Sequence, residues 1–475
     1  MGLKIHVLVI LSVFLSSICY AANSRKAQAL QEEWMGIYSG EDKIGYSHTV
    51  IKETENLEIS EETKLKLTVL GTNREVETKS DYVLNGYLVE SFHFVMKAGE
   101  ANVEAQGKRV GNELKIQTSS VSGKTYIDFP LTGKPLVSVA LFKWLSEQTL
   151  EAGRKYVIPL FDPTLVLAGA KPENLKTTLV IEGEEVIELS TGSFKTHRVK
   201  MFFAGSESQV WITEEGEVIK EASSIGLVSI RETEEKALRE TLSNLDIVEK
   251  TAVSSNVSLD DARNLKLLRV KVNGIESTDG FDLHDNNRQF VRNGVIEIRK
   301  DDISQVKSYT LPYSGEQYIH LVNSTSLIQS DNPMLINKSK EILQGEKNSL
   351  KAAKKINNWV YKDLKKVPTV SIPNALDVLK TGEGDCNEHA ALFAALSRAS
   401  GIPTNIALGI VYVDGKFYYH AWNEVFIGKW VSVDPVFGQF PADASHIKFI
   451  EGDLARAPEI IRLVGKINLD IKEAS

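Results

Sequence analysis

A repeat of two residues dominates the first half of the chain and constrains its fold more than any other feature. Apolar and polar residues alternate in LKLTVL (65–70) and in EVIEL (185–189). Such alternation is typical of strands that bury one face. Residues 23–248 are therefore predicted to form one or two antiparallel β-rich domains, with hairpin turns at EGE (182–184) and EEGE (214–217).

The pattern changes after residue 250. Two strand-like segments with Asn-Gly turns predict a small β module or linker over 249–330. From Asn332 onward the spacing becomes helical: NPMLINKSKEIL has a proline near its first turn, and SLKAAKKINNWVYKDL (349–364) carries one broad apolar face. Residues 331–475 are therefore predicted to form a C-terminal domain, and the whole chain an α+β protein.

The N-terminal segment MGLKIHVLVILSVFLSSICYAANS has the features of a secretory signal peptide. Lys4 gives a positive flank, an apolar run extends from Ile5 to Cys19, and small residues follow at Ala21 and Ala22. A retained membrane anchor is the alternative, but the run is shorter than the ~20 residues of a spanning helix. Residues 1–22 are therefore expected to be cleaved near Ala21 or Ala22, which places the mature protein in the periplasm or outside the cell.

Charge and cysteine usage narrow the function further. The formal net charge is −8 and no long basic run occurs, which argues against nucleic acid as a partner. The chain has two cysteines, and removal of Cys19 with the signal peptide leaves Cys386 alone. A single thiol in an exported protein is either buried and inert or reactive.

Cys386 lies in GEGDCNEHAALFAALSRASGIP (382–403), where an alanine-rich helix is predicted to begin. Asp385 followed by Glu388 is a capping pattern, so Cys386 is expected to be the first helical residue. The positive end of the helix dipole favours the thiolate there. The carboxylates of Asp385 and Glu388 act in the opposite direction, so the thiol needs a partner base.

His420 and Asp434 are the candidate partners. His420 lies in the strand pattern KFYYHAWNEVFI (416–427), and Asp434 ends the next one, KWVSVDP. An aspartate bonded to a histidine fixes its tautomer and stabilises its charged form.

The loop between these two strands decides whether the pair can form. A three-residue loop over 427–429 places Asp434 opposite Trp422, on the face of His420. A two-residue turn places it opposite Asn423, on the other face. The hypothesis therefore requires the longer loop or a bulge.

These segments resemble a known family. ALDVLKTGEGDCNEHAALFAALSRASGIPTNIALGIVY, then YYHAWNEVF, then KWVSVDPVFG resemble the core of the transglutaminase-like superfamily over about 332–453. The resemblance implies a papain-like domain, in which a helix bearing the cysteine packs on an antiparallel sheet. It also implies that Cys386 is the nucleophile, His420 the acid/base and Asp434 the residue that orients His420. No segment reads as a calcium loop, and no metal or cofactor is expected. The whole chain also resembles exported bacterial proteins that contain such a domain.

Further residues are candidates for supporting roles. Trp359 is a candidate oxyanion donor through its indole N–H, with core packing as the alternative. Trp422 and Asp385 are candidates for contact with the substrate or support of the triad. His389 is expected to be packed or hydrogen-bonded, and Asp443 and His446 are considered for support of the site.

The predicted chemistry is acyl transfer from a carboxamide through a thioester. Water as acceptor gives a protease or amidase, which we favour slightly, and a lysine amine gives a crosslinking transglutaminase. A protein or peptide substrate of the cell envelope follows from location alone. The competing hypothesis is a non-catalytic envelope binding or scaffold protein that retains the fold.

Overall fold

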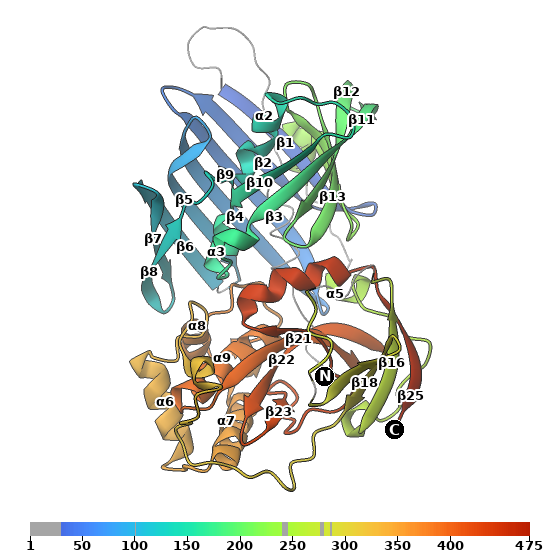
Figure 1. Ribbon diagram of the computed structural model, residues 1–475. Coiled ribbons are helices and arrows are strands. Elements are labelled where there is room, and N and C mark those ends of the chain that lie inside the picture. The colour runs from blue at the N-terminus through green and yellow to red at the C-terminus, as the bar shows by residue number, and fades with distance from the viewer. Residues whose placement is uncertain (1–29, 100, 240–245, 276–279, 286) are drawn as a thin grey trace. The chain divides into compact units, whose positions relative to one another are not determined.

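The computed structural model describes residues 30–475 except 100, 240–245, 276–279 and 286, so the predicted signal peptide lies outside the described residues. The chain divides into two compact units, one up to Ile247 and one from Val248 to Ser475 (Figure 1). Within the described part of the chain, no helix combines the length and apolar character that a membrane crossing needs.

The N-terminal unit is built on one sheet of fifteen strands. The order is β4-β3-β2-β1-β15-β14-β13-β12-β11-β10-β9-β5-β6-β7-β8, and an additional pairing of β4 with β5 closes the sheet into a barrel. All pairings except that of β9 with β10 are antiparallel, so the predicted antiparallel β-rich region is confirmed. The strands are β1 (Leu30–Ser39), β2 (Asp42–Glu53), β3 (Leu57–Val69), β4 (Thr72–Asn85), β5 (Leu88–Ala98), β6 (Ala101–Val110), β7 (Glu113–Ser120), β8 (Gly123–Pro130), β9 (Leu136–Val137), β10 (Lys155–Phe161), β11 (Lys176–Leu189), β12 (Gly192–Phe203), β13 (Ser206–Ile212), β14 (Val218–Ser223) and β15 (Leu227–Glu232).

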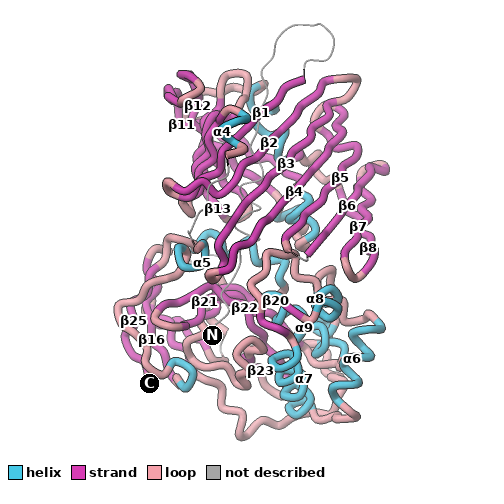
Figure 2. Tube along the Cα trace, turned by 180° about the vertical axis from the view of Figure 1, so that it is seen from behind, coloured by secondary structure: helices cyan, strands magenta, loops and turns pink. Residues whose placement is uncertain are grey.

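Short helices connect some of these strands, and long neighbouring strands such as β2, β3 and β4 run side by side (Figure 2). The helices are α2 (Leu141–Ser146), α3 (Pro163–Leu167) and α4 (Glu234–Ala237), with 3-10 turns at Ser138–Ala140 and Pro172–Asn174. Alternate residues of β3 are buried, as its sequence pattern predicts.

One predicted turn of this unit is confirmed and the other is wrong. Residues 214–217 connect β13 to β14, as predicted. Residues 182–184 lie inside β11, which continues to pair with β12 on both sides of them. The register shifts between Ile181 and Gly183, so the glycine is accommodated as a β-bulge and the strand does not turn.

The C-terminal unit combines a helical group with two four-stranded sheets. Helices α6 to α9 lie to one side of the sheet that contains β21, β22 and β23, and β16, β18 and β25 lie to its other side (Figure 1). The helices are α5 (Ile247–Lys250), α6 (Pro333–Leu343), α7 (Ser349–Asp363), α8 (Ala375–Thr381) and α9 (Cys386–Ala399), with 3-10 turns at Ala262–Asn264, Ile319–Val322 and Leu454–Leu463.

The two sheets of this unit have the orders β23-β22-β21-β24 and β17-β18-β16-β25. Their strands are β16 (Leu267–Asn273), β17 (Gln289–Arg292), β18 (Val295–Arg299), β21 (Thr404–Val413), β22 (Lys416–Phe426), β23 (Trp430–Val433), β24 (Ile447–Gly452) and β25 (Asn468–Ala474), and a parallel pair joins β19 (Lys365–Lys366) to β20 (Glu383–Gly384). Because β16 pairs with β25, the predicted 249–330 segment shares a sheet with the end of the chain. The domain boundaries inferred from the sequence stay predictions.

Helix α9 lies at the centre of the C-terminal unit. Every residue from Cys386 to Arg398 is buried except Asn387, and all ten residues of β21 are buried. Because residues 390, 391, 394 and 395 are buried alanines, the backbone of α9 can lie close to its neighbours. The amide of Asn423 in β22 donates to the carbonyl of Ala390 at 3.1 Å, which joins the helix to the sheet.

Candidate active site

Cys386 is the first residue of α9, as the capping pattern predicts. A side-chain oxygen of Asp385 accepts from the Asn387 N–H at 3.0 Å, and Glu388 accepts from the Asp385 N–H at 2.9 Å. The thiol is free and fully buried. The backbone N–H of Ala421 donates to its sulfur, so the sulfur lies beside the strand position that follows His420.

The environment of Cys386 favours the neutral thiol. Burial is the largest influence on its pKa, and the neighbouring Asp385 acts in the same direction, so the pKa is raised well above its ordinary value. The hydrogen bond from Ala421 opposes this only in part. The thiol is therefore protonated at neutral pH, and its proton must leave before or during any attack.

The loop between β22 and β23 has three residues. Phe426 pairs with Trp430 and Asn423 pairs with Val433, which leaves 427–429 as the loop. Continuation of this register places Asp434 opposite Trp422, on the face of the sheet that carries His420. This is the loop length that a pairing of His420 with Asp434 requires.

His420 and Asp434 form a buried hydrogen bond. His420 Nε2 lies 2.7 Å from Asp434 Oδ2, and both side chains are fully buried. The other oxygen of Asp434 accepts from the N–H groups of Val436 at 2.7 Å and Phe437 at 3.0 Å, which fixes the orientation of the carboxylate. Burial favours protonation of Asp434, but the contacts with His420 and His446 outweigh it and hold the pKa below its usual value.

This bond assigns the tautomer of His420. An ionised carboxylate oxygen can only accept, so Nε2 carries the proton and Nδ1 presents a lone pair. Nδ1 is buried and has no hydrogen-bond partner. Burial also lowers the pKa of His420, against the influence of Asp434, so the resting imidazole is neutral at pH 7. A neutral imidazole with a vacant acceptor nitrogen has the chemistry that a general base needs.

Two aromatic rings pack beside His420 and contribute to its burial. Phe437 is stacked on it with a centroid distance of 5.2 Å, and Trp422 is near-parallel to it at 6.1 Å. Trp422 is itself buried and lies edge-on to His446 at 5.2 Å. The sequence suggested Trp422 for contact with the substrate or support of the triad but did not indicate Phe437.

A second histidine shares the carboxylate of Asp434. His446 Nε2 lies 3.0 Å from Asp434 Oδ2, and its Nδ1 lies 3.2 Å from Asp443 Oδ1. Arg263 pairs with the other oxygen of Asp443 at 3.0 Å. The sequence offered Asp443 and His446 as supporting residues, whereas nothing in it pointed to Arg263.

The nitrogens of His420 and His446 and the oxygen of Asp434 form the one cluster in the described part of the chain with the spacing of a metal site. A tetrahedral zinc with bonds of about 2.1 Å would hold its ligand atoms roughly 3.4 Å apart. The two observed nitrogen–oxygen distances are 2.7 and 3.0 Å. They are hydrogen-bond distances, so we interpret the cluster as two imidazole N–H groups on one carboxylate oxygen.

The other residues that the sequence singled out are His389, Asp385 and Trp359. His389 is hydrogen-bonded through Nδ1 to the carbonyl of Asp385 at 2.6 Å, and burial lowers its pKa to about 4. Asp385 caps α9, and burial together with Glu388 raises its pKa. The ring of Trp359 lies against α6, with Lys338 Nζ 5.6 Å from its centroid. Its role as an oxyanion donor stays a prediction.

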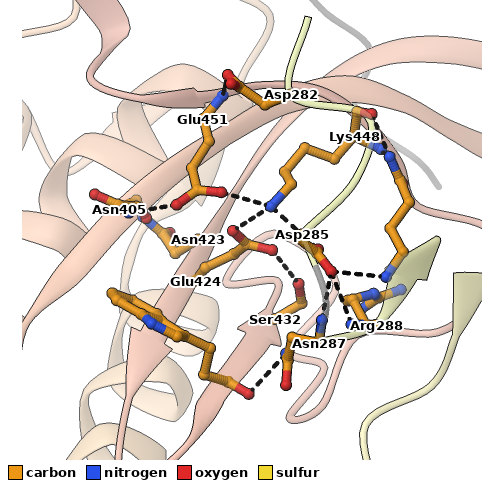
Figure 3. A network of polar contacts seen from close by, with 12 residues as sticks. Asp282, Asp285, Asn287, Arg288, Asn405, Asn423, Glu424, Ser432, Lys448 and Glu451 are labelled. Atoms are coloured by element: carbon orange, nitrogen blue, oxygen red, sulfur yellow. Dashed lines mark hydrogen bonds and ion pairs between the residues drawn. The ribbon is translucent and has the colours of Figure 1, made fainter. Parts of the chain in front are cut away.

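The face of β22 that carries His420 and Trp422 continues to Glu424, which belongs to a buried ionic cluster (Figure 3). Lys448 Nζ lies 2.7 Å from Glu424, 2.7 Å from Glu451 and 3.2 Å from Asp285. Ser432 donates to Glu424 at 3.0 Å. The cluster thus connects β22 and β23, next to the His420–Asp434 pair, with the segment before β17.

Comparisons with known proteins gave one family match, which covers part of the C-terminal unit. Residues 336–435 match the model described as the transglutaminase-like superfamily. The C-terminal part of the chain carries a transglutaminase-like domain. The matched range contains Cys386, His420 and Asp434, and it ends before His446. A search of curated proteins gave no match.

Three solved structures are similar to parts of the chain. A "putative cysteine protease" from Cytophaga hutchinsonii is 16% identical, with 45% of this chain and 85% of that chain covered and a TM-score of 0.29. A β-barrel-like protein of the DUF1849 domain from Brucella abortus is 10% identical, with coverages of 43% and 96% and a TM-score of 0.32. A "putative protease" from Parabacteroides distasonis is 11% identical, with coverages of 84% and 67% and a TM-score of 0.22. These similarities are too low to carry an argument about activity.

Proposed function

We propose that this protein is a thiol-dependent acyl-transfer enzyme that acts on carboxamide or peptide bonds. Cys386 is the nucleophile, His420 the general base and Asp434 the residue that orients His420. The observation that carries the proposal is the vacant Nδ1 of His420, one residue from the N–H group that holds the sulfur of Cys386. The match of 336–435 to the transglutaminase-like superfamily supports it.

The protonation states define the first chemical step. The thiol of Cys386 and the imidazole of His420 are both neutral at rest, so the thiol proton passes to His420 Nδ1 as the sulfur attacks the carbonyl carbon. The imidazolium that forms is stabilised by Asp434, which remains ionised. His420 then returns the proton to the leaving amine, and a thioester remains on Cys386.

The acceptor of the acyl group determines the type of enzyme. Hydrolysis of the thioester by water makes the protein a cysteine peptidase or amidase, and attack by a lysine amine makes it a transglutaminase. We favour hydrolysis, acting on a protein or peptide of the cell envelope, because the N-terminal segment resembles a signal peptide. The papain-like arrangement of the domain is part of this proposal.

The complete burial of Cys386 and His420 also supports a second candidate, a binding or scaffold protein with an unused site. Alkylation of Cys386 in the full-length protein by iodoacetamide, a small carboxamide, separates the two candidates. An enzyme is expected to label in the native state at pH 7 at a rate that falls at least about tenfold in His420→Ala, because the thiol loses its base. Mass spectrometry of the Cys386 peptide measures the rate.

Two comparisons complete the labelling experiment. His320→Ala, at an exposed position, is the matched control and should leave the native rate unchanged. In denaturant all three proteins should label alike. Equal native rates for wild type and His420→Ala would rule out the enzyme, since the thiol would then have no base.

Envelope extracts incubated with active protein would show new amines for hydrolysis or new isopeptide links for crosslinking.

A further inference from the structure

Charged groups of alternating sign lead from the surface to His420. Arg263 pairs with Asp443, His446 lies between Asp443 and Asp434, and Asp434 accepts from His420. The side chains of both aspartates and both histidines are fully buried, whereas Arg263 is 37% exposed. Each contact is 3.2 Å or shorter, so no water separates neighbouring groups.

The two ring nitrogens of His446 both face carboxylate oxygens. Nδ1 faces Asp443 Oδ1 at 3.2 Å and Nε2 faces Asp434 Oδ2 at 3.0 Å. A carboxylate can only accept, so a neutral imidazole would point a lone pair at one of these oxygens. Both nitrogens must therefore carry protons, and His446 is an imidazolium. Burial alone would lower its pKa, but Asp443 and Asp434 outweigh burial and raise it.

Asp443 is itself held in place by hydrogen bonds from two nearby residues. Ser445 donates to Asp443 Oδ1 through its N–H at 2.8 Å and through its hydroxyl at 2.5 Å. Gln439 donates to Oδ2 at 2.8 Å. Asp443 is thus held ionised on the far side of His446, and burial fails to raise its pKa because His446 and Arg263 act more strongly in the other direction.

We propose that His446 is a positioning residue of the active site: as a permanent imidazolium between Asp443 and Asp434, it aims Asp434 at His420 Nε2 and keeps His420 neutral until the thiol proton arrives. This inference rests on the proposed function. The roles of the two histidines then differ although both bind one oxygen, because only His420 has a vacant nitrogen.

The sign of the effect on His420 follows from the charges around it. Asp434 attracts a proton to His420, whereas His446 and Arg263 repel it. Lys366 lies within electrostatic reach of Asp434 and contributes a further positive charge on the α9 side. Without the positive charge of His446, less of the negative charge of Asp434 is offset. The pKa of His420 should therefore rise, and the pH above which it acts as a base should rise with it.

Nuclear magnetic resonance of full-length protein labelled with ¹⁵N-histidine tests the proposal directly. In the wild type, both nitrogens of His446 should be protonated at pH 7, and His420 should be the Nε2–H tautomer. In His446→Gln the titration of His420 should shift upward by about one pH unit. The acidic limb of the pH profile for iodoacetamide labelling of Cys386 should shift with it.

Two variants separate this role from a structural one. Arg263→Gln removes a more exposed charge further along the row, so it should shift the same limb in the same direction but by less. Ile447→Val, a buried neighbour of His446, should lower the melting temperature without moving the limb. A His446→Gln protein that melts earlier but keeps the His420 titration in place would overturn the proposal.

Other outcomes separate this proposal from the proposed function. If Cys386 does not label in the native wild type, the enzyme is ruled out, yet the protonation of His446 is still measured by resonance. If Cys386 labels and His446 is neutral at pH 7, only the further inference fails. Stoichiometric zinc in the purified protein that disappears in His446→Gln would identify the cluster as a metal site and would also overturn it.

Discussion

At the scale of single residues, Asp434 joins the backbone of one loop to two histidines. One oxygen holds two backbone N–H groups and the other holds two imidazoles. The backbone contacts hold one oxygen, and the contact with His446 holds the other toward His420. This explains how an ionised aspartate remains stable with no exposure to water, since every lone pair that faces the interior meets a donor.

Asp434→Asn should impair the site without unfolding it. With its amide nitrogen in the place of Oδ2, the asparagine can donate to His420 Nε2 once His446 has lost its Nε2 proton. This favours the tautomer of His420 whose Nδ1 carries a proton and cannot accept one from Cys386. Native labelling of Cys386 at pH 7 should fall roughly tenfold or more, and resonance should show the proton of His420 moved to Nδ1. Asp414→Asn, in the exposed β21–β22 turn, is the matched control, and an equal loss there would contradict the explanation.

At the scale of elements, the three-residue loop between β22 and β23 decides whether the site exists. A one-residue change in register would send Asp434 to the opposite face. Gly428 makes this loop feasible, because its φ is +109° and a Cβ there would lie 2.1 Å from the carbonyl oxygen of Lys307. The loop is therefore held by its contact with the backbone at Lys307 as well as by its own turn.

Gly428→Ala should be markedly more destabilising than Gly415→Ala. Both glycines have positive φ, but a Cβ at Gly415 meets nothing within 4 Å, so that variant has backbone strain alone. Gly428→Ala adds a clash with backbone, and we expect it to lower the free energy of unfolding by about 2 kcal/mol more. Urea denaturation measures the difference, and equal losses would show that the contact with Lys307 does not matter.

At the scale of the whole molecule, the C-terminal unit depends on contacts between distant segments. The segment before β17 enters the ionic cluster of Lys448, and β25 completes the sheet of β16. Division of the chain at 330 would separate β25 from β16 and Lys448 from Asp285.

Lys448→Met tests the strength of the cluster. It leaves Glu424, Asp285 and Glu451 without their shared cation, and Glu424 is buried enough that its pKa is already about 7. We expect a loss of about 3–5 kcal/mol in unfolding free energy of the C-terminal unit. Lys365→Met, whose side chain is 74% exposed, should change it by less than about 0.5 kcal/mol. Similar effects of the two variants would show that the cluster is not stabilising.

Local patterns predicted much of the scaffold correctly. The N-terminus of α9, its capping box and the start of α6 at Pro333 were all predictable. The length of the loop between β22 and β23 was left open by the sequence, and the strand pairing decided it. The turn predicted at 182–184 was wrong, because a glycine between alternating residues fits a bulge as well as a turn. Arg263 and Phe437 were missed, since nothing in their own neighbourhood marks them.

The sequence by itself determined the features that arise within a few residues: strands that alternate, a cysteine at a capped helix start, and a hairpin that carries His420 on one strand and Asp434 at the end of the next. These depend on hydrogen bonds and side-chain directions along a short stretch of chain. Only the tertiary structure decided that His446 shares the carboxylate of Asp434, that His420 Nδ1 is vacant and that the thiol is buried. Those properties depend on desolvation and on charges brought together from separate strands and loops, which no local spacing records.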